Sequence, residues 1–348
     1  MKFILFCQNN YAFGILEPIK EVLVTQKQDH IWFVADKIRD EFPYKDEKYT
    51  NKISVLEAYK SDVIFVPGNQ VPHYLRGLKT QIFHGLAGEK KGHFRIRHYF
   101  DLYLTQGPYF TNKFLELKEK HKDFDVIETG WPKLDIYGNA IELYKNEKTK
   151  LLDAHKANTI LLYAPTFSPK LTSAPHLIEQ IKDLAKNKEY IIFLKFHPLM
   201  DKDWVEKYKN LAASTDNIIY QTEKNIIKFL LMADLLISDT SSVIYEFILL
   251  DKPVISFKNI SKNINWEDTQ DYNQLVNLVE NNLNQDPFAK SRAFICEQFH
   301  PYNDGKSAKR MVEAVKNYIE THGVPERRKL SFLRRLKIYK LFGMPNKN

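Results

Sequence analysis

The sequence predicts an α/β protein with two domains, each a parallel sheet covered by helices. Short apolar runs alternate with segments of helical length, which is typical of parallel strands joined by helices. The alternation stops in a charged stretch at residues 141–158 and then starts again. A chain of 348 residues is also long enough for two domains of about 150 residues each.

Apolar runs place the strands of the first half, and several of these runs end in polar or glycine-containing corners. The expected strands are Phe3–Phe6, Ile31–Val34, Val63–Val66, Gln81–Phe83, Leu102–Leu104 and Val126–Ile127. Two of the corners are Pro67-Gly68-Asn69 and His84-Gly85. Because ligands bind beyond the carboxyl ends of strands in such sheets, we expect a site at these corners.

The second half repeats this pattern. Its expected strands are Thr159–Tyr163, Tyr190–Phe196, Asn217–Tyr220, Leu235–Ile237 and Val254–Phe257. Helices are expected at His176–Lys188, from about Asn225, at Val243–Leu250 and over much of 270–320. We therefore expect domains at residues 1–148 and 149–322, with a tail at 323–348, and a ligand-binding cleft between the two domains. The last helices of the second domain could pack on the first.

Residues 327–348 of the tail carry the whole net charge of +8, because they hold eight Lys/Arg and no Asp/Glu. We therefore expect no nucleic-acid partner, but a basic amphipathic helix that lies on an anionic membrane surface. The alternatives are a solvated helix and a helix docked on the body of the protein. The residues expected at the membrane are Arg327, Arg328, Phe332, Leu333, Arg334, Arg335, Leu336, Lys337 and Tyr339.

Cysteine usage in this chain fits a reducing compartment. The only cysteines, Cys7 and Cys296, are too far apart in sequence to indicate a disulfide framework or a cysteine-based zinc site. No apolar run approaches the roughly 18 residues of a membrane span, and the N-terminal run is too short for a signal peptide. We expect a cytoplasmic protein that is peripheral on the inner face of the membrane and binds no metal.

The corner Asp239-Thr240-Ser241-Ser242 lies between an apolar run and a helical segment. The first turn of a helix has free N–H groups and a positive dipole end, so it can hold an anion. Asp239 or Thr240 would cap the helix, leaving the hydroxyls of Ser241 and Ser242 for a ligand phosphate. The alternative is a helix cap that binds no ligand.

Two histidines follow predicted strands, one in each half. His84 lies in a loop with three glycines, where it could act as a general base, or simply bond to a neighbouring carbonyl. His197, in Lys195-Phe196-His197-Pro198, could donate to a phosphate or stabilise a leaving group, or be a structural residue at a strand end. Further anion sites are expected at Thr166 and at Asp304-Gly305-Lys306-Ser307, which precedes a helix. The sequence lacks a P-loop, a nucleophile elbow, a His-Glu-x-x-His metal site and a Gly-x-Gly-x-x-Gly loop.

Taken in order, these corners resemble the CDP-glycerol glycerophosphotransferase family, which includes teichoic-acid primases and polymerases and related capsule enzymes. The pieces that carry the resemblance span residues 84 to 310. They are His84-Gly85, Thr129-Gly130 with Pro132 and Asp135, Tyr163-Ala164-Pro165-Thr166, Lys195-Phe196-His197-Pro198, Ser238-Asp239-Thr240-Ser241-Ser242 and Asp304-Gly305-Lys306-Ser307. Two positions depart from the family pattern: Leu86-Ala87 replaces a Thr or Ser after the His-Gly corner, and Phe167 replaces a Trp.

The resemblance implies a GT-B-like fold in which the first domain binds the acceptor and the second binds a CDP-linked alditol. It implies transfer of glycerol-phosphate or ribitol-phosphate to a hydroxyl of a lipid- or polymer-linked acceptor, with release of CMP and no cofactor. By the same resemblance, His84 would be the base, His197 would contact the phosphate, and Gly85 and Lys91 would bind the acceptor. The residues expected at the donor are Thr166, Lys195, Asp239, Thr240, Ser241, Ser242, Glu246, Asp304, Gly305 and Ser307.

Two other functions remain open at this point. One is a GT-B glycosyltransferase or epimerase acting on a nucleotide sugar, although hydrolysing epimerases usually carry Gly-Gly where this chain has Ser241-Ser242. The other is a membrane-associated nucleotide-binding protein without catalytic activity.

Overall fold

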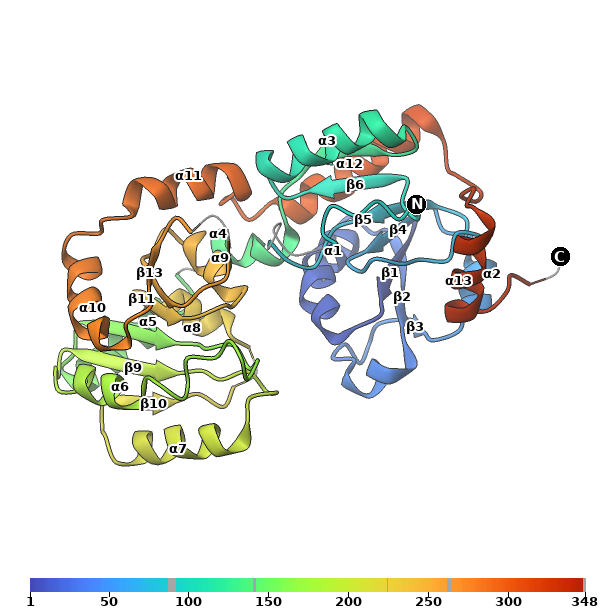
Figure 1. The fold of residues 1–348 in the computed structure, drawn as a ribbon. Coiled ribbons are helices and arrows are strands. Elements are labelled where there is room, and N and C mark those ends of the chain that lie inside the picture. The colour runs from blue at the N-terminus through green and yellow to red at the C-terminus, as the bar shows by residue number, and fades with distance from the viewer. Residues whose placement is uncertain (87–91, 140–141, 224, 262–263, 347–348) are drawn as a thin grey trace. The chain divides into compact units, whose positions relative to one another are not determined.

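The computed structural model describes residues 1–86, 92–139, 142–223, 225–261 and 264–346. It divides into two compact units (Figure 1). Unit 1 comprises Met1–Gly138 and Gln298–Asn348, and unit 2 comprises Asn139–Glu297.

Unit 1 is built on a seven-stranded parallel sheet with the order β3-β2-β1-β4-β5-β6-β7. The strands are β1 (Lys2–Cys7), β2 (Asp29–Val34), β3 (Tyr49–Thr50), β4 (Val63–Val66), β5 (Leu78–Gln81), β6 (Leu102–Thr105) and β7 (Asp125–Glu128). Its helices are α1 (Phe13–Thr25), α2 (Ile53–Tyr59), α3 (Pro108–His121), α4 (Asp135–Asn139, ending at the division), α12 (Ser307–His322) and α13 (Phe332–Phe342). The strand order reverses between β1 and β4, the kind of point where ligands bind in such sheets.

Unit 2 is built on a six-stranded parallel sheet with the order β10-β9-β8-β11-β12-β13. Its strands are β8 (Thr159–Tyr163), β9 (Tyr190–Leu194), β10 (Ile218–Tyr220), β11 (Leu235–Ser238), β12 (Val254–Phe257) and β13 (Glu267–Thr269). The helices are α5 (Lys145–His155), α6 (Ile178–Leu184), α7 (Lys202–Ala213), α8 (Ile227–Met232), α9 (Val243–Ile248), α10 (Leu275–Asn284) and α11 (Ala289–Phe299). Here the order reverses between β8 and β11.

The predicted α/β class with two parallel sheets is confirmed. The central strands are apolar on both faces because helices cover both sides of each sheet; every residue of β4 and of β11 is buried. The edge strands β3 and β13 were not predicted, because they are only two and three residues long and largely polar.

The strand β5 also differs from its prediction. The expected strand at Gln81–Phe83 is displaced to Leu78–Gln81, so His84 follows the strand end after two further residues. The reason is Lys79, a fully buried lysine whose ammonium donates to the carbonyl of Gly77 at 2.9 Å. Because of this lysine, the interior strand does not form an apolar run in the sequence and is not recognised from hydropathy.

The structure divides the chain differently from the boundaries expected from the sequence. The expected boundary at residue 148 falls inside α5, and residues 298–322, expected with the second domain, belong to unit 1. The cause lies at the start of α12, whose backbone N–H groups at Ser307 and Ala308 both donate to the Asp135 carboxylate at 2.7 Å. Helix α12 also packs against α1.

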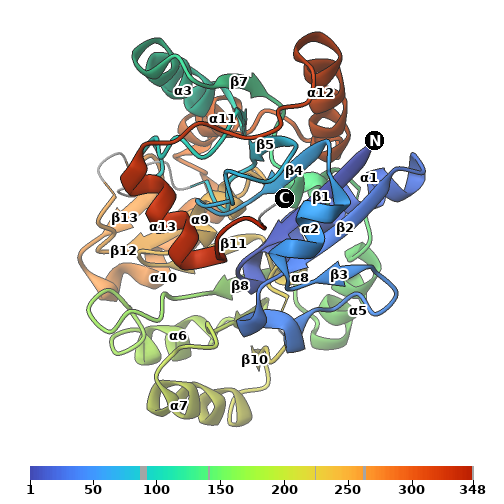
Figure 2. The same cartoon turned by 90° about the vertical axis from the view of Figure 1, so that its right-hand side faces the viewer.

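The tail is docked on unit 1 rather than free, and Figure 2 views the face that carries α13. Ile338 is fully buried in the core of this unit. Arg328 pairs with Asp101 and Asp123 at 2.6 and 2.9 Å, and the ring of Tyr339 packs against His73. Of the side chains expected at a membrane, Arg328 and Tyr339 therefore hold the tail to the protein instead. None of the described helices is long and apolar enough to span a membrane.

Candidate functional site

In unit 2, Asp239 ties together the loops that follow β8 and β11. Its buried carboxylate accepts hydrogen bonds from the backbone N–H groups of Thr166 and Ser173, both at 2.8 Å, and from the Ser173 hydroxyl at 2.9 Å. Burial raises the pKa of Asp239 to about 6. Asp239 was expected to cap the helix and to bind the donor, but its oxygens are directed to these protein groups. These hydrogen bonds shape the corner, and contact of Asp239 with the donor stays a prediction.

The hydroxyls that follow Asp239 lie beside the point where the strand order of unit 2 reverses. The Thr240 hydroxyl is buried and has no hydrogen-bond partner among the residues that the structure describes. Ser241 Oγ accepts from the Val243 N–H at 3.4 Å, and Ser242 is exposed. The N-cap residue of α9 is Ser242, and its side chain makes no capping hydrogen bond, so neither Asp239 nor Thr240 caps this helix. A buried hydroxyl without a partner is uncommon in a folded protein and calls for an explanation such as a bound water, an ion or a catalytic role.

His197 lies beyond the carboxyl end of β9, and its ring is bonded through Nδ1. The Leu199 N–H donates to His197 Nδ1 at 3.1 Å, and the ring stacks on Phe167 with centroids 4.4 Å apart. Because Nδ1 accepts, the proton of the neutral ring lies on Nε2, which is then a hydrogen-bond donor. Partial burial, followed by the nearby Lys195 ammonium, lowers the pKa of His197. Lys195 itself is buried, and burial lowers its pKa as well.

His84 of unit 1 is bonded in the opposite sense. Its Nδ1 lies 3.1 Å from the carbonyl oxygen of Pro67, which can only accept a hydrogen bond. Nδ1 must therefore carry the proton, and the neutral ring presents Nε2 as the acceptor. The exposed ring packs against Tyr11, with centroids 5.3 Å apart. Gly85 follows with its carbonyl accepting from Gln106 Nε2 at 3.1 Å, and Lys91, expected at the acceptor, lies outside the described residues.

The segment Asp304–Ser307 belongs to unit 1 and is not an open anion site. The start of α12 is already occupied by the Asp135 carboxylate, and Ser307 is fully buried. Asp304 forms an ion pair with Arg310 at 2.8 Å. The Asp135 carboxylate thus occupies the helix start at which Asp304, Gly305 and Ser307 were expected to bind the donor, and their donor-binding roles stay a prediction.

This segment packs against the motif that begins at Thr129, a pairing that sequence reasoning did not find. A side chain added at Gly130, which has φ +85°, would lie 2.4 Å from Ser307 Oγ. Gly138 similarly faces the backbone of Gly305, where an added Cβ would come within 2.4 Å. Only glycine allows such close approach, so the two motifs form one structural joint.

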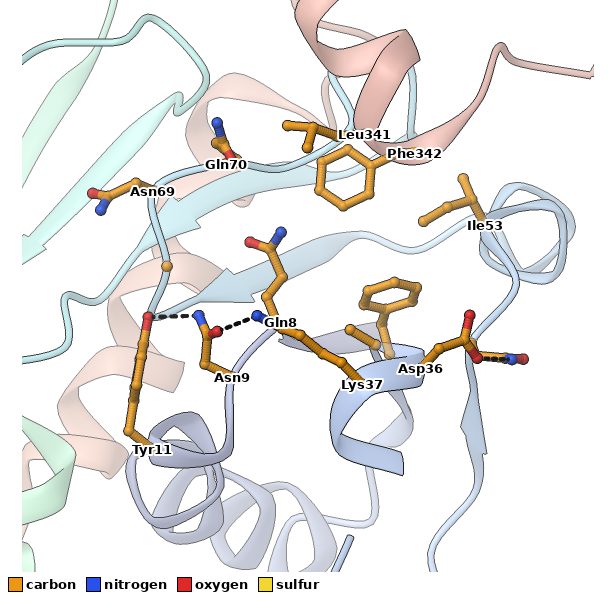
Figure 3. A pocket seen from close by; sticks show the side chains of 14 residues that line it. Gln8, Asn9, Tyr11, Asp36, Lys37, Ile53, Asn69, Gln70, Leu341 and Phe342 are labelled. Atoms are coloured by element: carbon orange, nitrogen blue, oxygen red, sulfur yellow. Dashed lines mark hydrogen bonds between the residues drawn. The ribbon is translucent and has the colours of Figure 1, made fainter. Parts of the chain in front are cut away.

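Unit 1 also contains a cavity of about 650 Å³, lined in part by Gly68 and Asn69 of a corner where a ligand site was expected (Figure 3). Residues that follow β1, β2 and β4 line it, among them Gln8, Asn9, Asn69 and Gln70. The side of the cavity at Gln8 and Asn9 was not predicted, although the polar corner Gln8-Asn9-Asn10 directly after an apolar run is a signal for it. Within the part of the chain that the structure describes, no group of three or more His, Cys, Asp or Glu residues could hold a metal ion.

Similarity to curated proteins lies in teichoic acid synthesis. The chain is 28% identical over 221 residues to the teichoic acid glycerol-phosphate primase of Bacillus subtilis (strain 168). The aligned region covers 57% of this chain and 53% of that protein. It is 25% identical over 277 residues to the teichoic acid ribitol-phosphate polymerase TarL of Staphylococcus aureus, covering 70% of this chain and 46% of TarL. The chain thus spans about half the length of these relatives.

Solved structures show the same fold at low identity. The wall teichoic acid polymerase TagF has a TM-score of 0.64 at 16% identity, covering 92% of this chain and 89% of that chain. The UDP-GlcNAc 2-epimerase of Neisseria meningitidis has a TM-score of 0.64 at 13% identity, covering 91% of this chain and 100% of that chain. These likenesses confirm the expected GT-B-like fold.

The family model described as CDP-Glycerol:Poly(glycerophosphate) glycerophosphotransferase matches residues 26–263. That range contains the His84, His197 and Asp239–Ser242 corners, and it covers more than half of the chain. The chain therefore belongs to the CDP-glycerol:poly(glycerophosphate) glycerophosphotransferase family.

Proposed function

We propose that the protein transfers glycerol-phosphate or ribitol-phosphate from a CDP-alditol to a hydroxyl of a lipid- or polymer-linked acceptor and releases CMP. Family membership and the teichoic-acid relatives support this class of reaction. The observation that carries the residue assignment is the opposite bonding of the two strand-end histidines, because the reaction needs one base and one donor. The product would be a teichoic-acid-like or capsule polymer of the cell surface.

His84 is the base in this proposal. The acceptor oxygen attacks the β-phosphorus of the CDP-alditol, the bond from that phosphorus to the CMP oxygen breaks, and the hydroxyl proton passes to His84 Nε2. The bond from Nδ1 to the Pro67 carbonyl fixes the tautomer that has an acceptor at Nε2. A positioned base typically accelerates such a step by about 10²–10⁴-fold.

His197 is the donor in this proposal. Its lowered pKa keeps the ring neutral near pH 7, with the proton on Nε2. This N–H can donate to a phosphate oxygen on which charge develops as CMP leaves. The stacking of Phe167 fixes the plane of the ring and hence the direction of the N–H.

The donor is held at the corner of unit 2 where the strand order reverses. The hydroxyls of Thr240, Ser241 and Ser242, with Thr166 from the neighbouring loop, supply hydrogen bonds to the phosphates and the alditol. Glu246 lies in the first turn of α9, and its carboxylate suits ribose hydroxyls rather than phosphate, because a carboxylate only accepts hydrogen bonds.

The exposed face of α13 attaches the protein to an anionic membrane, where a lipid-linked acceptor would lie. Phe332, Leu333 and Leu336 remain 64%, 77% and 46% exposed even though the opposite face is docked. Arg335 and Lys337 are exposed beside them, and residues 327–348 hold no acidic residue. Apolar side chains flanked by basic ones are the usual composition of an interfacial helix.

Transfer is tested by incubating the full chain with CDP-glycerol, CDP-ribitol or UDP-sugars and a lipid-linked acceptor, and measuring nucleotide release and product mass. We expect CMP release and alditol-phosphate transfer, and loss of most activity in His84→Ala and in His197→Ala. The matched control is His322→Ala, an exposed histidine of unit 1, which should retain full activity. Full turnover by both strand-end variants, or turnover of UDP-sugars alone, would contradict the proposal.

Membrane attachment is tested by sedimentation with phosphatidylglycerol vesicles. Leu333→Asp should reduce the bound fraction severalfold, because it puts a charge on the most exposed apolar position of α13. Val24→Asp, at an exposed apolar site on α1, is the matched control and should bind like the parent protein. Equal binding by both variants would rule out this face.

A further inference from the structure

The cavity of unit 1 lies where the strand order of its sheet reverses. Gln8 and Asn9 follow β1, and Gly68, Asn69 and Gln70 follow β4, the two strands on either side of the reversal. Figure 3 shows the Gln8 side chain pointing into the space between these two segments. Parallel sheets bind their ligands at this position, and a volume of about 650 Å³ suits a small molecule or one end of a larger one.

Side-chain amides dominate the polar part of the cavity lining. Asn9 is held in place by its Nδ2, which donates to the Tyr11 hydroxyl at 3.1 Å, and by its Oδ1, which accepts from Lys37 at 2.6 Å. The side chains of Gln8 and Gln70 make no hydrogen bond within the described part of the chain. An amide both donates and accepts, which matches the hydroxyl groups of sugars and alditols.

The charges at the cavity cancel and are already engaged. The lining contains one acidic and one basic side chain, Asp36 and Lys37. Asp36 accepts from the Asn51 amide at 2.6 Å, and Lys37 donates to Asn9. The Arg97 guanidinium donates to the Asn69 amide oxygen at 3.2 Å but is not part of the lining. The lining itself offers a phosphate no surplus of positive charge and therefore favours a neutral group.

One wall of the cavity is apolar and comes from the tail. Leu341 and Phe342 of α13 line it together with Phe33. The Tyr74 hydroxyl contacts the carbonyls of Phe342 and Gly343 at 3.3 and 2.7 Å, and the Phe342 ring packs against Phe6. This wall is therefore fixed, and it offers apolar surface to the carbon face of a sugar or to the start of an alkyl chain.

The cavity adjoins His84. Tyr11 lines the cavity and packs against the His84 ring, and Gly68 lines it directly after Pro67, whose carbonyl accepts from His84. A molecule seated in the cavity would therefore have an end hydroxyl close to the ring that we assign as the base.

We propose that this cavity binds the neutral, polyhydroxylated end unit of the acceptor, a sugar or an alditol, through the amides of Gln8, Asn9, Asn69 and Gln70. The identification of the ligand as the acceptor rests on the proposed function. The binding of a neutral polyhydroxylated group is argued from the cavity alone. Recognition by amides rather than by charge means that the unit to be extended is read by its hydroxyls.

The test uses three probes with the full chain: octyl β-D-glucoside below its micelle-forming concentration, methyl β-D-glucoside, and octyl phosphate. Ligand-observed NMR titration gives the Kd of each. We expect octyl glucoside to bind most tightly, methyl glucoside more weakly for lack of the alkyl chain, and octyl phosphate weakest. Tighter binding of octyl phosphate than of octyl glucoside would overturn the assignment to a neutral group.

Two variants locate the site. Gln8→Met and Gln70→Met keep side-chain length but remove the amide, and each should weaken octyl glucoside binding by roughly threefold to tenfold, the usual effect of one hydrogen bond. Gln285→Met, at an exposed glutamine of unit 2, should leave the Kd unchanged. If Gln8→Met fails to fold, Gln70→Met alone decides, and unchanged binding in it overturns the site.

Different results would contradict the proposed function and the proposed binding site. If no CDP-alditol is turned over but octyl glucoside binding depends on Gln8 and Gln70, the site stands and the transfer reaction falls. If transfer occurs and the variants keep the parental acceptor KM, the reaction stands and the site falls. If both are correct, the variants raise the acceptor KM and leave the KM for the CDP-alditol unchanged.

Discussion

Each unit places a histidine beyond the carboxyl end of one of its strands, but the two rings are bonded in opposite ways. His84 donates through Nδ1 to a carbonyl, and His197 accepts through Nδ1 from a backbone N–H. Nε2 is consequently an acceptor on His84 and a donor on His197. The lesson is that the bonded neighbour, rather than the residue type, decides which half of acid–base chemistry a histidine can perform.

The largest expected effect comes from replacing each of these histidines with glutamine. The glutamine amide can place an N–H near the position of Nε2, but it cannot accept a proton. His197→Gln should therefore retain about tenfold more transfer than His197→Ala, whereas His84→Gln should be as inactive as His84→Ala, about 10²–10⁴-fold below the parent. Initial rates of CMP release measure this.

Circular dichroism spectra and melting temperatures of the four variants serve as the control for folding. Rescue of His84 by glutamine, or failure of glutamine to rescue His197 at all, would break the contrast between base and donor.

A second contrast concerns two buried aspartates that each receive two backbone N–H groups. Asp135 joins α12 to the Thr129 motif in unit 1, and Asp239 joins two loops in unit 2. An asparagine has one acceptor oxygen, so Asp135→Asn and Asp239→Asn should each lower the free energy of unfolding by about 1–3 kcal/mol, the loss for one unsatisfied buried donor. Urea denaturation measures this.

Only Asp239→Asn should also raise the KM for the CDP-alditol, because Thr166 at the donor corner is tethered by this carboxylate. An equal rise in KM for Asp135→Asn would show that the start of α12 does take part in donor binding.

The smallest expected effect is a difference between the two units in how their stability depends on pH. Burial lowers the pKa of His73, His93 and His300, all in unit 1, from 6.5 to about 4. Their neutral forms are favoured in the folded state, so stability is lost as the pH falls from about 6.5 toward 4, by about 1.4 kcal/mol per pH unit for each group. In unit 2, the raised pKa of Asp239 has the opposite sign and adds stability as the pH falls through about 6. The lowered pKa of His197 in unit 2 and the raised pKa of Asp135 in unit 1 act against this division, but the three histidines of unit 1 outweigh these single groups.

Hydrogen exchange at pH 7 and pH 5 should therefore show unit 1 opening first in acid. His300→Gln provides the control: glutamine can still accept from the Trp131 N–H that donates to His300 at 2.9 Å, but it does not titrate. Its acid sensitivity should be smaller than that of the parent. Earlier opening of unit 2 would contradict the assignment of these signs.

The sequence was sufficient for the two parallel sheets, because strands covered on both faces are apolar throughout and stand out from their surroundings. It was also sufficient to place His84 and His197 beyond strand ends. It could not show which nitrogen of each ring is bonded, because that depends on a carbonyl from another loop and on a turn after Pro198.

Other features escaped for specific physical reasons. The pattern at Asp304–Ser307 correctly indicated a helix start but not that Asp135 already fills it, since the two are far apart in sequence. The amides that line the cavity have no periodic spacing that would bring them together. The tail has the same amphipathic pattern whether its apolar face meets a lipid or a protein core. In α13 one face is docked on the protein core, and we propose that the opposite face meets the membrane.

Helix α13 both lines the cavity and carries the exposed apolar face, and this has a thermodynamic consequence. Phe342 and Leu341 belong to the cavity wall, and Leu333 lies on the exposed face of the same helix. Any ligand that requires this wall stabilises the docked helix, and any surface that binds the docked helix stabilises the wall. By linkage, a ligand of the cavity must raise the affinity of the protein for vesicles by the same factor by which vesicles raise its affinity for that ligand. Octyl glucoside and vesicles would therefore each report on the binding of the other.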